Sequence, residues 1–149
     1  MADEVVLAFD YGERRIGVAV GQTASGTASP VGTLPAHGQP DWTAVDRCLR
    51  DWAPDRVLVG LPYNMNGTET ALTAACRAFA AELSSRSSLP VELVDERLTS
   101  SAATSELREA RRSGARARRV RREDIDANAA RLILETWLRR PKPDGGTHS

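Results

Sequence analysis

Three acidic residues stand where their carboxylates could act together on one reaction. Asp10 follows an apolar run that begins at Val5, and Glu96 follows a second apolar run. Both acids should therefore lie at the carboxyl ends of strands, where open α/β sheets place their ligand sites. Asp126 falls on the apolar stripe of the last predicted helix, at four, seven and eleven residues before Ala130, Ile133 and Trp137. Because burial of a lone carboxylate is costly, Asp126 needs a partner or a metal ion.

Three carboxylates from separate elements suit a hard divalent cation, Mg²⁺ or Mn²⁺, because such ions prefer oxygen ligands. Two such ions about 4 Å apart could activate water and stabilise the leaving oxygen during phosphodiester cleavage. Each acid alone also has an ordinary explanation. Asp10 could form a turn, Glu96 could be a surface acid, and Asp126 could stabilise a helix N-terminus.

The cysteines and histidines are few and poorly placed for catalysis. The two cysteines, Cys48 and Cys76, fall within helical apolar patterns and form no CxxC pair, so we expect buried thiols. Of the two histidines, His37 lies in a Pro- and Gly-flanked loop and His148 is the penultimate residue. These placements disfavour Ser-His-Asp, Cys-His and zinc mechanisms, which leaves carboxylate chemistry.

The apolar patterns predict an α/β sheet with an antiparallel edge, in the order three strands, helix, strand, helix, strand, helices. The expected strands are Val5–Asp10, a second one through Ile16, Val18 and Val20, Ala28–Leu34, a buried parallel strand at Arg56–Gly60, and Val91–Val94 running into Asp95 and Glu96.

Helices are predicted from stripes of apolar residues and from their stop signals. The stripes are Trp42, Val45, Leu49 and Trp52, ended by Pro54, and then Leu72, Cys76, Phe79 and Leu83. Thr99 or Ser100 is the expected N-cap of a further helix, and the last helix should run from about Asp124 to Arg139, before Pro141.

A strongly basic segment precedes the last helix. Residues 108–122 hold eight arginines and a single acid, Glu109, although the whole chain has a net charge of +0. Such a strip suits a phosphate backbone, and a solvated helix face is the alternative. The arginines predicted to bind nucleic acid are Arg112, Arg116, Arg118, Arg119, Arg121 and Arg122.

Length and composition predict one globular domain over residues 1–140 and a disordered tail at 141–149. The chain has 41% apolar and 27% charged residues, which argues against a disordered or fibrous protein. No apolar run approaches the roughly 20 residues of a membrane span, and acids stand where a signal peptide would be basic. We therefore expect a cytoplasmic protein with no membrane partner.

The glycines near the N-terminus offer a different enzyme class. Asp10-Tyr11-Gly12 with Gly17 resembles the first phosphate-binding hairpin of the actin, hexokinase and acetate kinase superfamily. It is no Walker A loop, because Val18-Ala19 stands where Lys-Ser/Thr is needed. A kinase of that superfamily also normally needs two such domains.

Taken together, four motifs resemble the YqgF family of Holliday-junction resolvases and pre-16S rRNA nucleases, over about Val5 to Trp137. They are LAFDYG with RIGVAVG, VGLP with NMNGTE, DERLTS, and Ile125-Asp126 with Ala129-Ala130 and Ile133-Leu134-Glu135. Asn66 and Ala127 depart from the family pattern without removing a proposed ligand.

The resemblance implies a ribonuclease H-like fold related to the RuvC resolvases, with Asp10, Glu96 and Asp126 as catalytic residues that bind Mg²⁺ or Mn²⁺. Asp95 should point away from Glu96, since adjacent strand residues face opposite sides. The resemblance implies a nuclease, and we expect it to mature the 5′ end of pre-16S rRNA, with ribosomal particles as partners.

Three alternatives stay open at this stage. A four-way DNA junction is the other substrate, and its resolution would need a symmetric dimer rather than a monomer. A ribosome-assembly factor could bind RNA without cutting it. The kinase-like hairpin is the third alternative.

Overall fold

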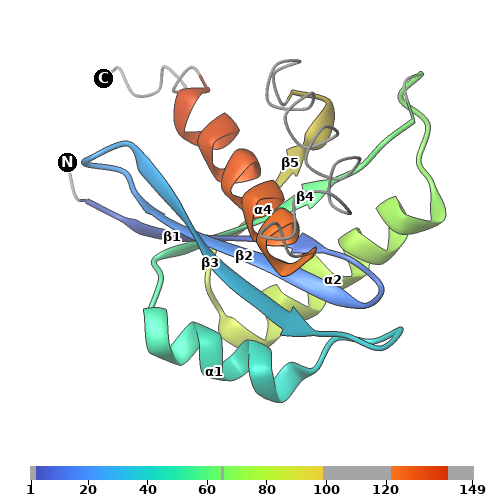
Figure 1. The fold of residues 1–149 in the computed structure, drawn as a ribbon, viewed down its shortest axis with the longest axis horizontal. Helices are drawn as coiled ribbons and strands as arrows, with labels where there is room; N and C mark the ends of the chain where they lie inside the picture. Colours follow the sequence, from blue (N-terminus) through green and yellow to red (C-terminus); the bar gives the residue numbers. More distant parts are fainter. Residues whose placement is uncertain (1–2, 65, 99–121, 141–149) are drawn as a thin grey trace.

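The computed structural model describes residues 3–64, 66–98 and 122–140. Its centre is one five-stranded sheet with the strand order β3-β2-β1-β4-β5 and helices on both faces (Figure 1). The strands are β1 (Val5–Tyr11), β2 (Arg15–Gln22), β3 (Thr27–Pro35), β4 (Arg56–Leu61) and β5 (Val91–Asp95), and the helices are α1 (Trp42–Trp52), α2 (Ala71–Ser87), the 3₁₀ helix η1 (Glu96–Leu98) and α4 (Arg122–Arg139).

The sheet is mixed, as the sequence predicts. β1, β2 and β3 form an antiparallel meander, and β4 and β5 continue the sheet in parallel with β1. α1 follows β3 and α2 connects β4 to β5, which is the crossover that parallel strands require. The carboxyl ends of β1, β4 and β5 therefore lie at the same edge of the sheet.

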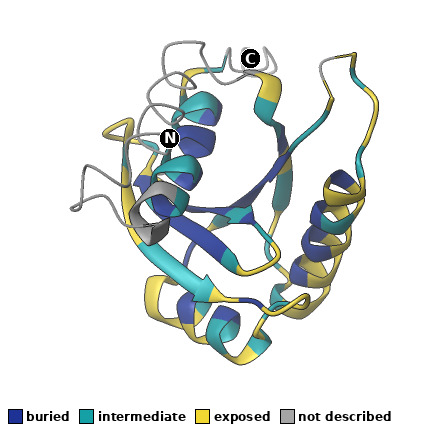
Figure 2. Cartoon of the chain, turned by 45° about the vertical axis from the view of Figure 1, so that its right-hand side comes forward, coloured by how far each residue is buried: buried dark blue, intermediate teal, exposed yellow. Residues whose placement is uncertain are grey.

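Alternate residues of the central strands face two separate cores. Leu7 and Phe9 of β1 pack in a core with Phe79 and Leu83 of α2. Val6 and Ala8 pack in a second core under α4. The central strands are accordingly buried on both faces, as predicted, while α1 and α2 expose their outer sides (Figure 2).

Two predicted core positions are wrong. Trp52 is 41% exposed because it is the last residue of α1, and Leu72 is 37% exposed in the first turn of α2. Thr73 takes the buried position instead. Its hydroxyl donates to the Pro62 carbonyl oxygen, and it forms a capping box with Thr70, so the first turn of α2 is fixed by polar contacts.

Several element boundaries also differ from the predictions by one or two residues. β1 continues to Tyr11, so Asp10 lies within the strand, and Glu96 begins η1 rather than ending β5. α4 begins at Arg122 instead of Asp124. Cys48 and Cys76 are buried free thiols, as predicted. Thr99, Ser100, most of the basic segment, residues 141–149 and His148 lie outside the described residues.

No helix in the described part of the chain is long and apolar enough to cross a membrane.

Candidate active site

Asp10 lies on the face of the sheet that α4 covers. Val6 and Ala8 precede it at two-residue intervals and belong to the core under α4, so the pleat of β1 turns Asp10 to the same side. Its partner across the antiparallel pair of β1 and β2 is Gly17. A side chain at Gly17 would collide with the backbone carbonyl oxygen of Asp126. The missing side chain thus lets α4 approach the sheet directly beside Asp10.

Glu96 reaches the same face from the other side of β1. Its Oε2 atom lies over Gly60 of β4, where an added Cβ would be only 2.8 Å from that oxygen and 2.5 Å from Ile133 of α4. Since β4 pairs with both β1 and β5, it lies between the strand that carries Asp10 and the strand that Glu96 follows. Gly60 therefore provides the space that the Glu96 carboxylate occupies.

The thiol of Cys76 in α2 lies close enough to Asp10 and to Glu96 for each carboxylate to affect its pKa. Burial raises the pKa of Cys76 to about 12, and the negative charges of Glu96 and Asp10 add to that rise. One thiol thus responds to both carboxylates. That the two acids share one reaction centre stays a prediction.

Asp126 is held by an arginine from β2. Its Oδ2 accepts a hydrogen bond of 2.8 Å from Nε of Arg15, and both side chains are about a quarter exposed, 25% and 29% respectively. Arg15 and Asp126 are 111 positions apart in the chain. This charge-assisted pair fixes the start of α4 against the beginning of β2.

The three predicted acids do not form a ready cation cage in this arrangement. Among the described residues, no group of three or more His, Cys, Asp or Glu side chains is placed to hold a metal ion. The backbone of α4 brings Asp126 to the sheet face of Asp10 and Glu96, and Arg15 holds its carboxylate. The assignment of all three acids as catalytic residues and metal ligands stays a prediction.

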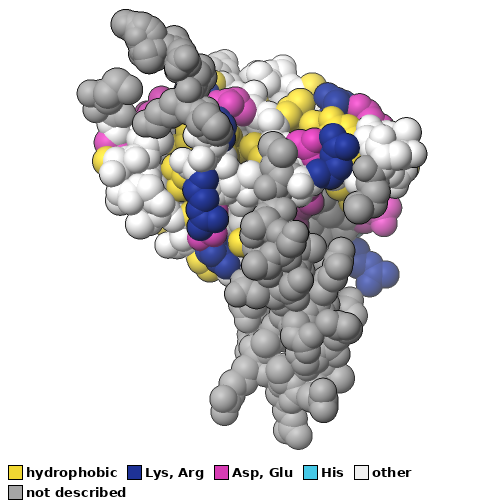
Figure 3. All heavy atoms as spheres, turned by 90° about the horizontal axis from the view of Figure 1, so that it is seen from above, with side chains coloured by type: hydrophobic (Ala, Val, Ile, Leu, Met, Phe, Trp, Pro, Cys, Tyr) yellow, Lys and Arg dark blue, Asp and Glu magenta, His cyan; other side chains and the backbone are white. Residues whose placement is uncertain are grey.

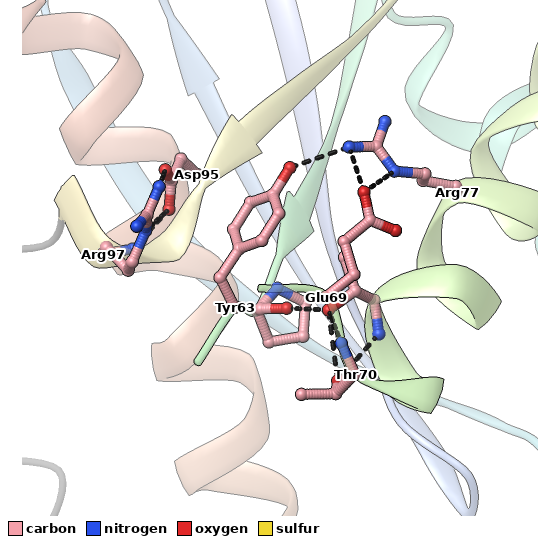
Figure 4. Close-up of polar contacts among 8 residues, drawn as sticks. Tyr63, Glu69, Thr70, Arg77, Asp95 and Arg97 are labelled. Carbon is pink, nitrogen blue, oxygen red and sulfur yellow. Dashed lines mark hydrogen bonds and ion pairs between the residues drawn. The ribbon is translucent and has the colours of Figure 1, made fainter. Parts of the chain in front are cut away.

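Asp95 is engaged elsewhere. Its Oδ1 atom accepts a hydrogen bond of 3.1 Å from Nε of Arg97 and its Oδ2 atom accepts one of 2.7 Å from Nη2, and these bonds lower the pKa of Asp95 (Figure 4). The guanidinium of Arg97 lies 4.9 Å from the centre of the Tyr63 ring. Asp95 therefore fixes the loop after β4 against η1.

Sequence reasoning missed this loop contact. Tyr63 accepts a 2.8 Å hydrogen bond from Arg77 of α2, which also binds Glu69 at 2.9 Å (Figure 4). Together with Arg97, these residues join the ends of β4 and β5 to α2. Figure 3 shows that Lys and Arg side chains adjoin acidic ones on the face seen from above. Gly67 of the NMNGTE motif lies in this loop, and its φ of 87° favours glycine.

Arg15 is the second residue that sequence reasoning missed as a functional group. It belongs to the RIGVAVG motif, but a local pattern shows no partner for it. Of the predicted nucleic-acid-binding arginines, the first five lie outside the described residues, and only the backbone of Arg122 is described, at the start of α4.

Comparison with known proteins identifies the family. The model of the RuvX family, described as "Holliday junction resolvase", matches residues 4–140. The chain belongs to this family. Family membership makes it a nuclease, which confirms the enzyme class and the resemblance found in the sequence motifs.

Curated relatives are similar over nearly their whole length. A protein of Marinobacter nauticus is 50% identical over 135 residues, which cover 90% of this chain and 92% of the relative. A protein of Saccharophagus degradans is 42% identical over 144 residues, covering 96% and 99%. Both are named "Putative pre-16S rRNA nuclease".

Solved structures confirm the RuvC-like, ribonuclease H-like fold. The RuvC of Thermus thermophilus gives a TM-score of 0.51 at 16% identity, covering 91% of this chain and 95% of that one. The yeast mitochondrial Holliday junction resolvase Ydc2 gives 0.50 at 14% identity, covering 90% and 77%. At these identities the likeness concerns the fold alone.

Proposed function

We propose that this nuclease is a metal-dependent endonuclease, and that Asp10, Glu96 and Asp126 hold its Mg²⁺ or Mn²⁺ ions. The observation that carries the proposal is the shared sheet face of Asp10 and Glu96, where Gly17 and Gly60 leave room for α4 and for a carboxylate. A side chain at either position would collide with one of the proposed ligand residues. Glycines at these two positions therefore favour one common site for the acids over three unrelated acidic residues.

The donor set fits a hard cation. All three side chains offer only carboxylate oxygens, the ligands that Mg²⁺ and Mn²⁺ prefer. A bound divalent ion would polarise a phosphodiester and lower the pKa of a bound water. Arg15 and the cation would compete for the Asp126 carboxylate, so Arg15 keeps that carboxylate beside the site when no cation is present.

The substrate we propose is structured RNA at the 5′ end of pre-16S rRNA, with ribosomal particles as partners in the cytoplasm. The names of relatives up to 50% identical support this choice. The arginines at 112–122 would bind the phosphate backbone, since each neutralised phosphate releases counterions. Base stacking contributes little, because only 5% of residues are aromatic.

A four-way DNA junction is the second candidate substrate. The description of the matched family favours it. Cutting two strands of a junction symmetrically requires a two-fold dimer, so this function predicts a homodimer on the substrate, whereas RNA trimming is compatible with a monomer.

The decisive experiment offers both substrates to the purified protein. A labelled RNA that spans the 16S 5′ precursor junction and a labelled four-way DNA junction are incubated with Mg²⁺, Mn²⁺ or EDTA. Asp10→Asn is the inactive variant. Asp46→Asn is the matched control, because this acid lies on α1 in the other helix layer, where it forms a 3.5 Å ion pair with Arg86.

Cleavage of RNA that needs the cation, survives Asp46→Asn and disappears in Asp10→Asn would support the proposal. Cleavage of the DNA junction alone would move the function to junction resolution. RNA binding without cleavage of either substrate would indicate an assembly factor. Cleavage that survives Asp126→Asn would overturn the assignment of that ligand.

A further inference from the structure

An open hollow lies beside the candidate active site, on the other side of Arg15. It is formed where β2 begins and β3 ends. Its lining residues are Arg14, Arg15, Thr33, Leu34, Pro35 and His37.

Backbone hydrogen bonds fix the shape of this hollow. The N–H of Ala36 donates to the carbonyl of Arg14, and the N–H of Gly38 donates to the carbonyl of Glu13, both at 3.0 Å. Gly38 has a φ of 76°, a conformation that favours glycine and turns the chain at this point. The segment that carries His37 is thus joined to the β1–β2 turn, and Arg14 and His37 lie on one preformed surface.

The hollow has cationic lining residues and no acidic ones. Arg14 is exposed, and no carboxylate in the described part of the chain forms an ion pair with it. The hollow between α1 and α2 is different, since Asp46 lines it together with Arg50 and Arg86, and Arg86 pairs with Asp46 and Glu82. The charge of the first hollow therefore suits an anion.

Arg15 connects this hollow to the candidate active site. Its Nε–H is bound to Asp126, and a guanidinium carries five N–H donors in all, so donors remain for a second anion. Thr33 adds a hydroxyl and His37 adds an imidazole to the lining. A chain of phosphates that followed the hollow would arrive next to Asp126.

We propose that this hollow binds the phosphodiester backbone of the substrate strand beside the bond to be cut, with Arg14, Arg15 and His37 as phosphate contacts. The inference rests on the proposed function and assigns phosphate contacts to three residues that lie far in sequence from the basic segment at 108–122.

The test measures binding rather than cleavage. Arg14→Gln, His37→Gln and the double variant are made in the Asp10→Asn background, and anisotropy of labelled RNA and labelled four-way DNA is recorded at several salt concentrations. Arg50→Gln is the matched control, because Arg50 is also exposed and lines the hollow that contains Asp46. Arg14→Lys keeps the charge and should restore binding.

We expect Arg14→Gln to weaken binding roughly 3- to 10-fold and to reduce the slope of log K against log salt by about 0.7 to 1, the loss of one phosphate contact. His37→Gln should have a smaller effect, and Arg50→Gln none. The substrate whose affinity falls, RNA or DNA, identifies the source of the backbone.

The two proposals fail in different ways. Suppose that the Asp10→Asn protein binds nucleic acid, that the protein without substitutions cleaves it, and that the Arg14→Gln and His37→Gln variants bind as tightly as Arg50→Gln. The hollow is then not a phosphate site, and the proposed function stands. If the Asp10→Asn protein binds neither RNA nor four-way DNA, both proposals are overturned. Circular dichroism confirms that each variant is folded.

Discussion

The two faces of the central sheet differ in the residue types that line them. On the α1 and α2 face, Phe79 stacks on Tyr11 and Trp42 at 5.0 and 5.3 Å and meets the edge of Phe9 at 5.7 Å. On the α4 face, β2 and β4 carry glycine at positions 17 and 60, where the helix backbone and a carboxylate come close.

This difference separates stability from chemistry. Large aromatic and aliphatic groups bury the most apolar area, so the α1 and α2 face supplies much of the folding free energy. Glycines bury little apolar area, and the space that their missing side chains leave is occupied by the Glu96 carboxylate and by the start of α4 beside Asp10. Variants on the two faces should therefore affect different measurements.

The largest expected effect is on cleavage. Asp10→Asn and Glu96→Gln each remove a negative charge from the α4 face, and we expect the rate of metal-dependent cleavage to fall by roughly 10²- to 10³-fold or more. The melting temperature should change little, because neither variant alters side-chain volume much. Rates and thermal melts measured on the same preparations check both statements, and a variant with full activity would remove its residue from the site.

Phe79→Ala tests the opposite face. The ring is 3% exposed and contacts three other aromatic rings, so its removal should cost about 3–5 kcal/mol in the free energy of unfolding. Urea denaturation measures this loss. Cleavage by the fraction that remains folded should stay close to normal at low temperature. A selective loss of cleavage in a stably folded variant would contradict the separation of the two faces.

Gly17→Ala should affect both properties. The added methyl group collides with the Asp126 carbonyl oxygen, so α4 must shift, at a cost of about 1–3 kcal/mol. Because Asp126 moves with the helix, cleavage should fall by roughly 10- to 100-fold. Ala80→Gly on α2, at a buried position of the other face, is the comparison variant, and it should lower stability without this loss of activity.

The smallest effect concerns alkaline pH. Burial raises the pKa of Cys76 to about 12, above its ordinary value of 9.0, so the folded state binds a proton that the unfolded state releases between these values. The resulting stability is fully present below about pH 9 and is lost as the pH rises toward 12. The slope for one thiol is at most about 1.4 kcal/mol per pH unit.

Cys76→Ala should therefore make the fall of unfolding free energy above pH 9 shallower. Urea titrations at pH 8, 9 and 10 measure it. Cys48→Ala gives a second reference, since burial and the charge of Asp51 raise the pKa of Cys48 to about 11. Equal slopes in the authentic chain and both variants would contradict buried, protonated thiols.

Much of this architecture could be predicted from local sequence patterns. The continuous apolar run of β1 and the two-residue alternation in β2 predicted the buried hairpin, and the apolar spacing of Phe79 and Leu83 predicted the buried side of α2. Strand geometry predicted that Asp95 and Glu96 point to opposite sides, but Glu96 lies in η1 rather than in β5, so strand alternation does not extend to it. Such patterns are informative because strand and helix geometry fix where neighbouring side chains point.

Residues at the ends of elements were harder to predict. The apolar period continues through Trp52 and Leu72, yet both are exposed, and they are the last residue of α1 and the second residue of α2. Thr73 is buried through a hydrogen bond to Pro62, eleven positions away. A hydrophobicity pattern contains no information on such polar contacts.

The sequence by itself determined the types of the elements, the buried cysteines and the three acids that could share a site. Only the tertiary structure decided that Arg15 holds Asp126, that Gly60 lies under Glu96, and that Arg14 and His37 line one hollow. The physical reason is the sequence separation of the residues in contact. Periodicity acts over a few residues, whereas each of these features joins segments more than 20 positions apart and forms only when separate elements pack together.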